Sequence, residues 1–315
     1  MLDGSGLSLV DVAKRALAGR SALDRKTLAT AADLFLLELV RNKARPSSVR
    51  WYENKLSALL AALGNLYLDD ITRADILACV QAQGVSEATQ ASYCRAIRAV
   101  WRWALRQEPA MVALDVTEGL PTSTRHRENV SPGILTVADA ARIMAGADRF
   151  RSALALLLFA GIRPQEIWGV DKPPLLWRHI LPEEKLIRVP AEVAKTRKPR
   201  LIEGLPPTVW VWLQPGPADQ PVCHASSQWL IRSAQLAGGF SRKEGGQHCV
   251  LRPWPHDATR HSFATYALAL TGDPGRVSLW LGHEGNPRML YTHYRGLATK
   301  AEAERYFAIR PALPA

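Results

Sequence analysis

A polar segment near the middle of the chain constrains the fold more than any other feature, because it separates two stretches of different pattern. Residues Glu118–Pro132 read EGLPTSTRHRENVSP, with a proline towards each end and no apolar periodicity. Such a composition is typical of an exposed linker between domains. The chain has 315 residues, enough for two cores. We therefore predict a flexible lead-in at 1–24, a first domain at 25–117, a linker at 118–133 and a second domain at 134–315.

The first of these domains has the pattern of a small helical bundle. Leu34, Leu37 and Val40 recur every three residues and indicate one face of a helix that begins near Thr27. Further helices are expected after a serine cap at 47 or 48 and after the Thr-x-x-Asp pattern at 72–75. A long fourth helix is expected from Ser86 to about residue 107, so this domain should be all α.

The second domain mixes helices with a few short strands. The pattern Thr-x-x-Asp at 136–139 predicts a helix start, and the apolar run Ala153–Ile162 predicts a buried core helix. That run is far shorter than the ~18 residues of a membrane span. Three antiparallel strands are expected at 175–180, 185–193 and 200–203, with helices from Pro206 almost to the end. The predicted fold class is mainly α: an all-α N-terminal domain and an α+β C-terminal domain with a small three-stranded antiparallel sheet.

The balance of charge points to a polyanionic partner. The formal net charge of +11 and the pI near 9.8 make nucleic acid the first candidate. Arg95, Arg98 and Arg102 would form one cationic stripe on the fourth helix, although a solvated helix face is the alternative. Arg197 and Lys198 add positive charge to the turn between the last two strands. We expect these five residues to bind double-stranded DNA.

Cysteine usage and the N-terminus bear on compartment and cofactors. None of the four cysteines belongs to a Cys-x-x-Cys pair, so the spacing typical of a zinc ribbon or a thioredoxin site is missing. The first residues do not show a charged segment followed by an apolar core and a cleavage site. We therefore expect a cytoplasmic protein with reduced thiols that contacts no membrane and needs no metal and no cofactor.

Two positions in the second domain could bind or protonate a phosphate. Arg163 precedes Pro164, so it is expected at a junction between two helices, with its side chain free to leave the core. The alternative is a surface arginine paired with Glu166. Lys195 lies in the basic turn of a predicted hairpin, where a lysine can donate a proton to a leaving alkoxide or simply be solvated.

A denser group of such residues follows near the C-terminus. His256 and Arg260 are four residues apart, so one helical turn would direct both into the same cleft, while His261 would face elsewhere. His283 follows a glycine that would let the backbone turn, so that the imidazole projects. Histidines and an arginine bind phosphate, and a tyrosine hydroxyl can attack it. The group ends with two tyrosines, Tyr291 and Tyr294.

Taken in order, these segments resemble the tyrosine recombinases, also called phage-type integrases. The resemblance rests on Ala-Gly-Ile-Arg-Pro-Gln-Glu-Ile, a Lys-Thr turn, the segment 256–265, Leu-Gly-His and a following tyrosine, and it covers about residues 27 to 308. It implies that the helical first domain corresponds to the family's core-binding domain and the second to its catalytic domain. It also implies site-specific recombination or integration by metal-independent cleavage and rejoining of DNA.

The resemblance implies a role for each candidate residue. Arg163 and Arg260 would hold the non-bridging oxygens of the scissile phosphate, since a guanidinium matches phosphate in a bidentate way. His256 and His283 would add hydrogen bonds to the developing charge, and His256 is the candidate acceptor of the tyrosine proton. Lys195 would protonate the departing 5′ oxygen. The tyrosine would form a 3′-phosphotyrosyl link, which the 5′-hydroxyl of a second strand reverses.

The nucleophile is open to two assignments. Tyr291 lies eight residues after His283 and Tyr294 lies eleven after it, and neither spacing is the usual one in the family. The segment Glu284–Pro287 could hold a one-residue insertion, which would bring Tyr294 into register. We therefore expect Tyr294 to attack, with Tyr291 as the alternative nucleophile.

The family pattern also implies an assembly of four protomers on two duplexes, so we expect a homotetramer on paired DNA sites. The segment 299–309 could dock on a neighbouring protomer or pack on its own domain. Two other functions use similar residues: a nicking and resealing enzyme of the type IB topoisomerase kind, and a catalytically weak DNA-binding relative. Relaxation of supercoiled DNA without exchange between two sites would favour the first, whereas the full set of candidate residues argues against the second.

Overall fold

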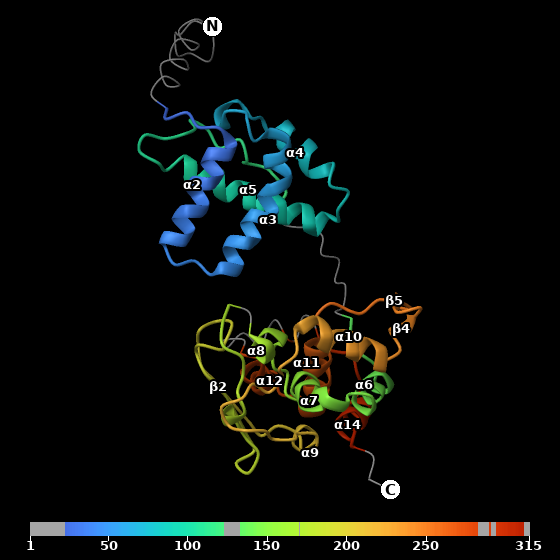
Figure 1. Cartoon of the computed structure of the whole chain (residues 1–315). Helices are drawn as coiled ribbons and strands as arrows, with labels where there is room; N and C mark the ends of the chain where they lie inside the picture. Colours follow the sequence, from blue (N-terminus) through green and yellow to red (C-terminus); the bar gives the residue numbers. More distant parts are fainter. Residues whose placement is uncertain (1–22, 123–132, 170, 283–289, 291–293, 312–315) are drawn as a thin grey trace, which may run out of the picture. The chain divides into compact units, whose positions relative to one another are not determined.

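The chain is seen in a computed structural model that describes residues 23–122, 133–169, 171–282, 290 and 294–311 (Figure 1). It divides into two compact units, Met1–Glu128 and Asn129–Ala315. Their boundary falls inside the interval 118–133 that the sequence marks as a linker. Each unit has its own cluster of buried apolar side chains, so each is described by itself.

The N-terminal unit is an all-helical bundle. Thr72 and Asp75 form the reciprocal capping box that their spacing predicts, whereas α3 begins with Pro46 in its first turn and not with a serine cap. Trp101 of α5 and Leu56 of α3 are fully buried in its core. The elements are α2 (Leu28–Arg41), α3 (Pro46–Leu63), the short 3-10 helix η1 (Leu68–Asp70), α4 (Arg73–Gln81) and α5 (Glu87–Ala104).

The buried face of α2 differs from the predicted one. The residues at the predicted face are 38%, 59% and 58% exposed, namely Leu34, Leu37 and Val40. Phe35 is buried instead, and it packs edge-on against the rings of Tyr52 and Trp103, with centroids 5.1 and 5.8 Å away. Apolar residues lie on more than one side of α2, so their spacing alone does not say which side is buried. The aromatic rings of α3 and α5 that contact Phe35 decide this.

The C-terminal unit packs its helices around α7. All of α7 except Arg151 is buried, as the apolar run predicts, and α6, α9 and α11 contact it. No helix of the described residues, α7 included, is long and apolar enough to cross a membrane. The helices are α6 (Val137–Ala145), η2 (Asp148–Phe150), α7 (Arg151–Phe159), α8 (Pro164–Trp168), η3 (Trp177–His179), α9 (Thr208–Val211), α10 (Ser227–Ala237), α11 (Ala258–Thr271), α12 (Pro274–Leu281) and α14 (Lys300–Phe307).

A three-stranded antiparallel sheet confirms the predicted fold class. Its strands lie side by side in chain order: β1 (Ile180–Leu181), β2 (Leu186–Val189) and β3 (Arg200–Glu203). The first strand begins later than predicted, because Trp177–His179 forms a 3-10 turn and Leu176 pairs with Pro221. The turn between β2 and β3 contains Lys195, so the sheet presents this turn at one of its ends.

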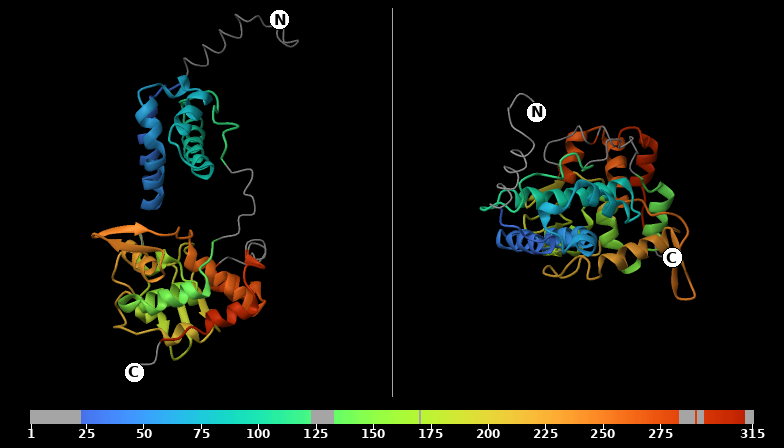
Figure 2. Two further views of the ribbon diagram at one scale, coloured as in Figure 1. Left: turned by 90° about the vertical axis from the view of Figure 1, so that its right-hand side faces the viewer. Right: turned by 90° about the horizontal axis from the view of Figure 1, so that it is seen from above.

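A second hairpin contradicts the prediction of helices from Pro206 almost to the end. Strands β4 (Ser241–Glu244) and β5 (Gln247–Val250) pair antiparallel and stand out from the unit in both views of Figure 2. Gly245 and Gly246 join them with φ values of +55° and +83°. A two-residue turn with positive φ at both positions matches the twist of a hairpin. The adjacent glycines in the sequence therefore indicate this hairpin.

The C-terminal helix α14 packs on its own unit, which is the second of the two arrangements expected for the segment 299–309. Tyr306 is fully buried and stacks on Tyr266 of α11, with ring centroids 4.1 Å apart. Its hydroxyl donates to the Leu158 carbonyl of α7 at 2.8 Å. The helix therefore completes the core behind α7 and α11.

Candidate active site

A sharp turn after α7 positions the first predicted phosphate-binding residue. Gly161 has a φ of +64°, and a Cβ there would lie 2.3 Å from Cδ1 of Phe263, so only glycine fits. Arg163 follows at the N-cap of α8, with Pro164 in the first turn, as the sequence predicts. The side chain of Arg163 is 15% exposed. It contacts Glu166, but it is not a solvated surface arginine.

Arg260 on α11 is almost fully buried and ties two chain turns together. Its guanidinium donates to the carbonyl oxygens of Gly161 and Leu281, which lie where α7 and α12 give way to the following loops. Burial and, after it, the nearby charges of Arg163 and Arg200 lower the pKa of Arg260 to about 9. The side chain therefore stays cationic at neutral pH while it holds both turns in place.

Arg200, at the start of β3, is a site residue that the sequence does not single out. Its terminal nitrogens donate to the two carboxylate oxygens of Glu166 at 2.9 and 2.7 Å. Glu166 is 1% exposed and also accepts from the backbone N–H of Arg163 at 3.0 Å. Burial acts to raise the pKa of Glu166, but hydrogen bonds and charge from Arg200, then from Arg163, lower it overall. One buried carboxylate thus orients two arginines.

The same arginine lies against the turn that leads to His283. Gly282 caps α12 with a φ of +63°, and a Cβ there would approach Cδ of Arg200 to 3.0 Å. Arg200 Nε also donates to the Trp280 carbonyl at 3.3 Å. Arg200 therefore joins β3, α8 and the end of α12. His283 itself lies outside the described residues.

Tyr294 lies beside α11 with its hydroxyl inside the unit. It is 7% exposed, and its hydroxyl oxygen is 2.7 Å from Nδ1 of His261. Burial raises the pKa of Tyr294, the charge of Arg260 acts to lower it, and the charge of Asp257 adds to the rise. The phenol is therefore within electrostatic reach of the buried Arg260. Tyr291, the alternative nucleophile, lies outside the described residues.

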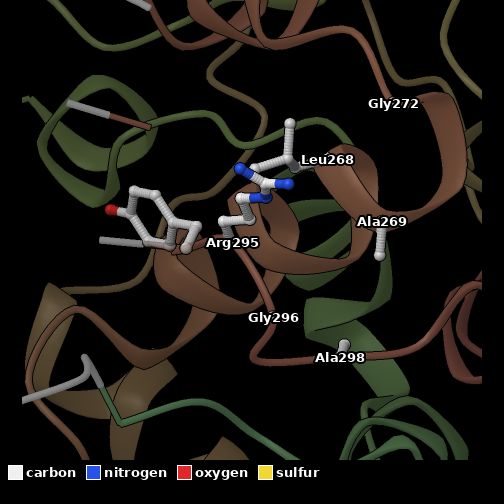
Figure 3. Close-up of a pocket in the computed structure, with 7 residues that line it drawn as sticks. Leu268, Ala269, Gly272, Arg295, Gly296 and Ala298 are labelled. Atoms are coloured by element: carbon white, nitrogen blue, oxygen red, sulfur yellow. The ribbon is translucent and has the colours of Figure 1, made fainter. Parts of the chain in front are cut away.

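A pocket of about 500 Å³ borders the same tyrosine and is drawn in Figure 3. Arg295 and Tyr294 form part of its wall. The remaining lining residues are small or apolar and belong to the second half of α11 and to the segment before α14: Leu268, Ala269, Gly272, Gly296 and Ala298. Space is thus left beside the segment that holds the tyrosine, on the side of α11.

Comparison with solved structures places this geometry in a known fold. Lambda integrase in a dimer bound to a COC′ core site matches with a TM-score of 0.64 and 16% identity, over 87% of this chain and 98% of that chain. A lambda integrase tetramer bound to a Holliday junction matches with a TM-score of 0.63 and 16% identity, over 87% and 80%. The Tn1549 transposon integrase in complex with a circular intermediate DNA matches with a TM-score of 0.56 and 14% identity, over 89% and 98%.

The chain has the tyrosine recombinase fold. This finding confirms the fold that the sequence motifs imply. No protein-family model and no curated protein matches the chain, so the likeness is visible in the structure and in a few short motifs only.

Within this recombinase fold, His256 does not share a helical face with Arg260. Helix α11 begins at Ala258, after Asp257 in the left-handed region with a φ of 47°. The side chain of His256 is 92% exposed, and its Nδ1 lies 3.8 Å from the carboxylate of Asp257. A spacing of four residues places two side chains on one face only inside a helix, and His256 precedes the helix. His261, expected to face elsewhere, contacts Tyr294 instead.

The β2–β3 turn of the recombinase fold presents three cations to solvent. Lys195, Arg197 and Lys198 are all exposed. The turn is fixed at the Ala194 carbonyl, which accepts from the backbone N–H of Arg197 at 3.1 Å and from the ammonium group of Lys172. The exposure suits a group that meets DNA, and that contact stays a prediction.

The predicted cationic stripe on α5 lies against the segment that ends the N-terminal unit. Arg98 donates to the carbonyl oxygens of Thr117 at 2.7 Å and Leu120 at 3.2 Å, and it is half-buried. Arg95 donates to the Thr122 carbonyl at 2.9 Å. Arg102 is 61% exposed, with Nε 3.5 Å from the carboxylate of Asp115. The three arginines thus differ in role, since Arg98 supports the fold while Arg102 faces solvent.

Proposed function

We propose that this chain is a site-specific DNA recombinase that cleaves and rejoins DNA through a 3′-phosphotyrosyl intermediate on Tyr294. The observation that carries the proposal is a buried tyrosine hydroxyl within electrostatic reach of Arg260, whose guanidinium also holds the turn before Arg163. Two fixed guanidinium groups match a phosphodiester and need little reorganisation as charge develops. The tyrosine recombinase fold supports the same function.

The proposed reaction makes one bond to phosphorus and breaks another. The oxygen of Tyr294 attacks the scissile phosphate, and the 5′ oxygen leaves with a proton from Lys195. The 5′-hydroxyl of a second strand then attacks the phosphotyrosine and restores the free tyrosine. His283 is proposed to hydrogen-bond the phosphate, and His256 is proposed to add a hydrogen bond from its exposed position before α11. The arginines supply the positive field throughout the exchange.

The proposed partner is double-stranded DNA, bound by a homotetramer on paired sites. Lambda integrase is seen as a dimer on a core site and as a tetramer on a Holliday junction. The net charge of +11 fits a protein that neutralises many phosphates, so its affinity for DNA should fall steeply with salt. We propose that the N-terminal unit is a core-binding domain and that the C-terminal unit is catalytic.

A pool of nicked duplexes with a random central sequence tests the proposal without a known target. Cleavage near the nick releases a short strand, so the reverse reaction is lost and the covalent complex accumulates. We expect a protein–DNA complex that survives detergent, with the modified residue identified by peptide mass spectrometry as Tyr294. The captured sequences then define a cleavable duplex for the experiments below.

Two outcomes would overturn this proposal. Absence of any covalent complex across the pool, with the protein folded and bound to DNA, contradicts strand cleavage by a tyrosine. A complex that relaxes a supercoiled plasmid but exchanges no strands between two captured sites would favour a nicking and resealing enzyme. Recombination between the two sites, by contrast, supports the proposed activity.

The α5 arginines give a prediction with two separate readouts. Arg102→Ala should weaken binding to a random 30-base-pair duplex and lower the slope of log affinity against log salt by about 1, as expected for one lost phosphate contact. Arg98→Ala should instead destabilise the N-terminal unit by about 1–3 kcal/mol, because it removes a donor from the carbonyl groups of two buried residues, Thr117 and Leu120. Fluorescence anisotropy and thermal unfolding measure the two effects.

The matched control for the stripe is Arg41→Ala, an exposed arginine in the last turn of α2. It removes the same charge from the same unit, so it corrects for the loss of general electrostatic attraction. If the slope of log affinity against log salt is equal for Arg102→Ala and Arg41→Ala, the stripe is not part of the DNA interface.

A further inference from the structure

The hydrogen bond between Tyr294 and His261 has a chemical consequence for the proposed reaction. The hydroxyl oxygen of Tyr294 and Nδ1 of His261 are 2.7 Å apart, and the two rings lie 5.6 Å apart between centroids. His261 belongs to α11, directly after Arg260, so a rigid helix holds the imidazole in place. The nucleophile is thus in contact with a base before any DNA is bound.

An attacking tyrosine must lose its proton as it bonds to phosphorus. Burial raises the pKa of Tyr294, so few phenolate ions form unaided near neutral pH. A general base has to lie within roughly 2.6–3.2 Å of the proton it removes. His261 meets this requirement, whereas His256, the acceptor implied by the family resemblance, is 92% exposed and precedes the helix.

Asp257 supplies the negative charge that a protonated His261 would need. The carboxylate of Asp257 and the ring nitrogens of His256 and His261 offer atoms that all lie within 4.8 Å of one another. The backbone carbonyl of Asp257 also accepts the backbone N–H of His261 at 2.9 Å, which fixes the two residues relative to each other.

We propose that His261 is a catalytic residue whose Nδ1 accepts the proton of Tyr294 as the phenol oxygen attacks phosphorus, with Asp257 stabilising the imidazolium. This inference rests on the proposed recombinase function. In the cleavage step the Tyr294 O–H bond breaks, an N–H bond forms on His261, and the P–O bond to the 5′ oxygen breaks as Lys195 protonates it. In the rejoining step the 5′-hydroxyl of the second strand gives its proton to Lys195 as its oxygen bonds to phosphorus, and His261 returns its proton to Tyr294 as the bond between the tyrosine oxygen and phosphorus breaks. The cycle therefore has no net change in protons.

The decisive variant is His261→Asn. The Oδ1 atom of asparagine reaches about the same place as Nδ1 of histidine and can accept the hydroxyl hydrogen bond, but it cannot take the proton. We expect cleavage of the captured duplex to slow by about 10²–10⁴-fold, with DNA binding and the unfolding midpoint unchanged. Replacing Tyr294 by a fluorinated tyrosine of lower pKa should restore about tenfold or more of that loss.

Two controls separate proton acceptance from other roles. His248→Asn alters another half-buried histidine with a hydrogen bond, to Ser241 at 3.1 Å, and should leave cleavage unchanged. A duplex with sulfur in place of the 5′ bridging oxygen needs no proton for its leaving group. It should therefore rescue Lys195→Met and leave the defect of His261→Asn in place.

The outcomes also distinguish this inference from the proposed function. If the parent chain forms the adduct and His261→Asn cleaves within about threefold of it, the inference is overturned and the proposed function stands. The inference is also overturned if His261→Asn is slow and fluorinated tyrosine does not rescue it. In that case the defect lies in the positioning of Tyr294 and not in proton acceptance. If the parent chain forms no adduct at all, the inference and the proposed function are both overturned.

Discussion

Tyr294→Phe is expected to form no covalent complex with the captured duplex, whereas Tyr291→Phe is expected to form it at close to the parent level. Removal of the hydroxyl removes the nucleophile itself, so cleavage should fall to the background rate and not merely slow down. Binding to the same duplex should persist, because Arg163 and Arg260 are untouched. Denaturing gel electrophoresis of the trapped complex measures the adduct, and anisotropy measures the binding.

The same pair of variants settles the open assignment of the nucleophile. Tyr294 is buried against His261, and this contact supports its assignment as the nucleophile. The reverse pattern, with adduct retained in Tyr294→Phe and lost in Tyr291→Phe, would move the nucleophile to Tyr291.

Glu166→Gln is expected to cost the C-terminal unit about 3–5 kcal/mol of stability, since removing one partner of a buried ion pair leaves the other charge uncompensated. Glu166 accepts both terminal nitrogens of Arg200 and the backbone N–H of Arg163. Without its charge, three arginines would lie close together with little solvent to screen them. Urea unfolding followed by tryptophan fluorescence measures the loss, and adduct formation should fall with it.

Lowering the pH should reduce the difference in unfolding free energy between Glu166→Gln and the parent chain. The pKa of Glu166 is lowered from its ordinary value of 4.5, so its carboxylate contributes stability above that value. The contribution is lost as the pH falls through the lower folded-state pKa. The difference in unfolding free energy should therefore be greatest near neutral pH and shrink well below pH 4.5.

The control for this prediction is Glu203→Gln, a glutamate on β3 that is exposed. It changes the same group on a neighbouring element without touching a buried pair, so its effect should stay within about 0.5 kcal/mol. Equal losses in the two variants would contradict the view that Glu166 holds the arginines together.

Local chemistry made much of the fold predictable. The capping boxes at Thr72 and Thr136 mark helix starts, and the apolar run in α7 predicts a buried core helix. The proline after Arg163 predicts the start of α8. These signals depend on residues close together in the chain, so they can be read without knowing the partner elements.

The features of the fold and of the site that the sequence does not predict depend on residues far apart in the chain. Arg200 is one of several basic residues in its segment, and nothing local shows that it meets Glu166, 34 positions away. The contact between His261 and Tyr294 spans 33 positions, and it depends on where Tyr294 packs against α11. The exposed side of α2 was missed for the same reason, since aromatic rings on α3 and α5 select the buried side.

The sequence by itself determined the two-part organisation, the small sheet, the resemblance to the recombinases and the positions of Arg163, Arg260 and the two candidate tyrosines. Only the tertiary structure decided which groups touch: that Glu166 orients two arginines, that Arg260 holds two turns, and that His261 contacts the hydroxyl of Tyr294. The physical reason is that residue types and local spacing determine helices and turns, whereas hydrogen bonds between distant side chains depend on the packing of whole elements.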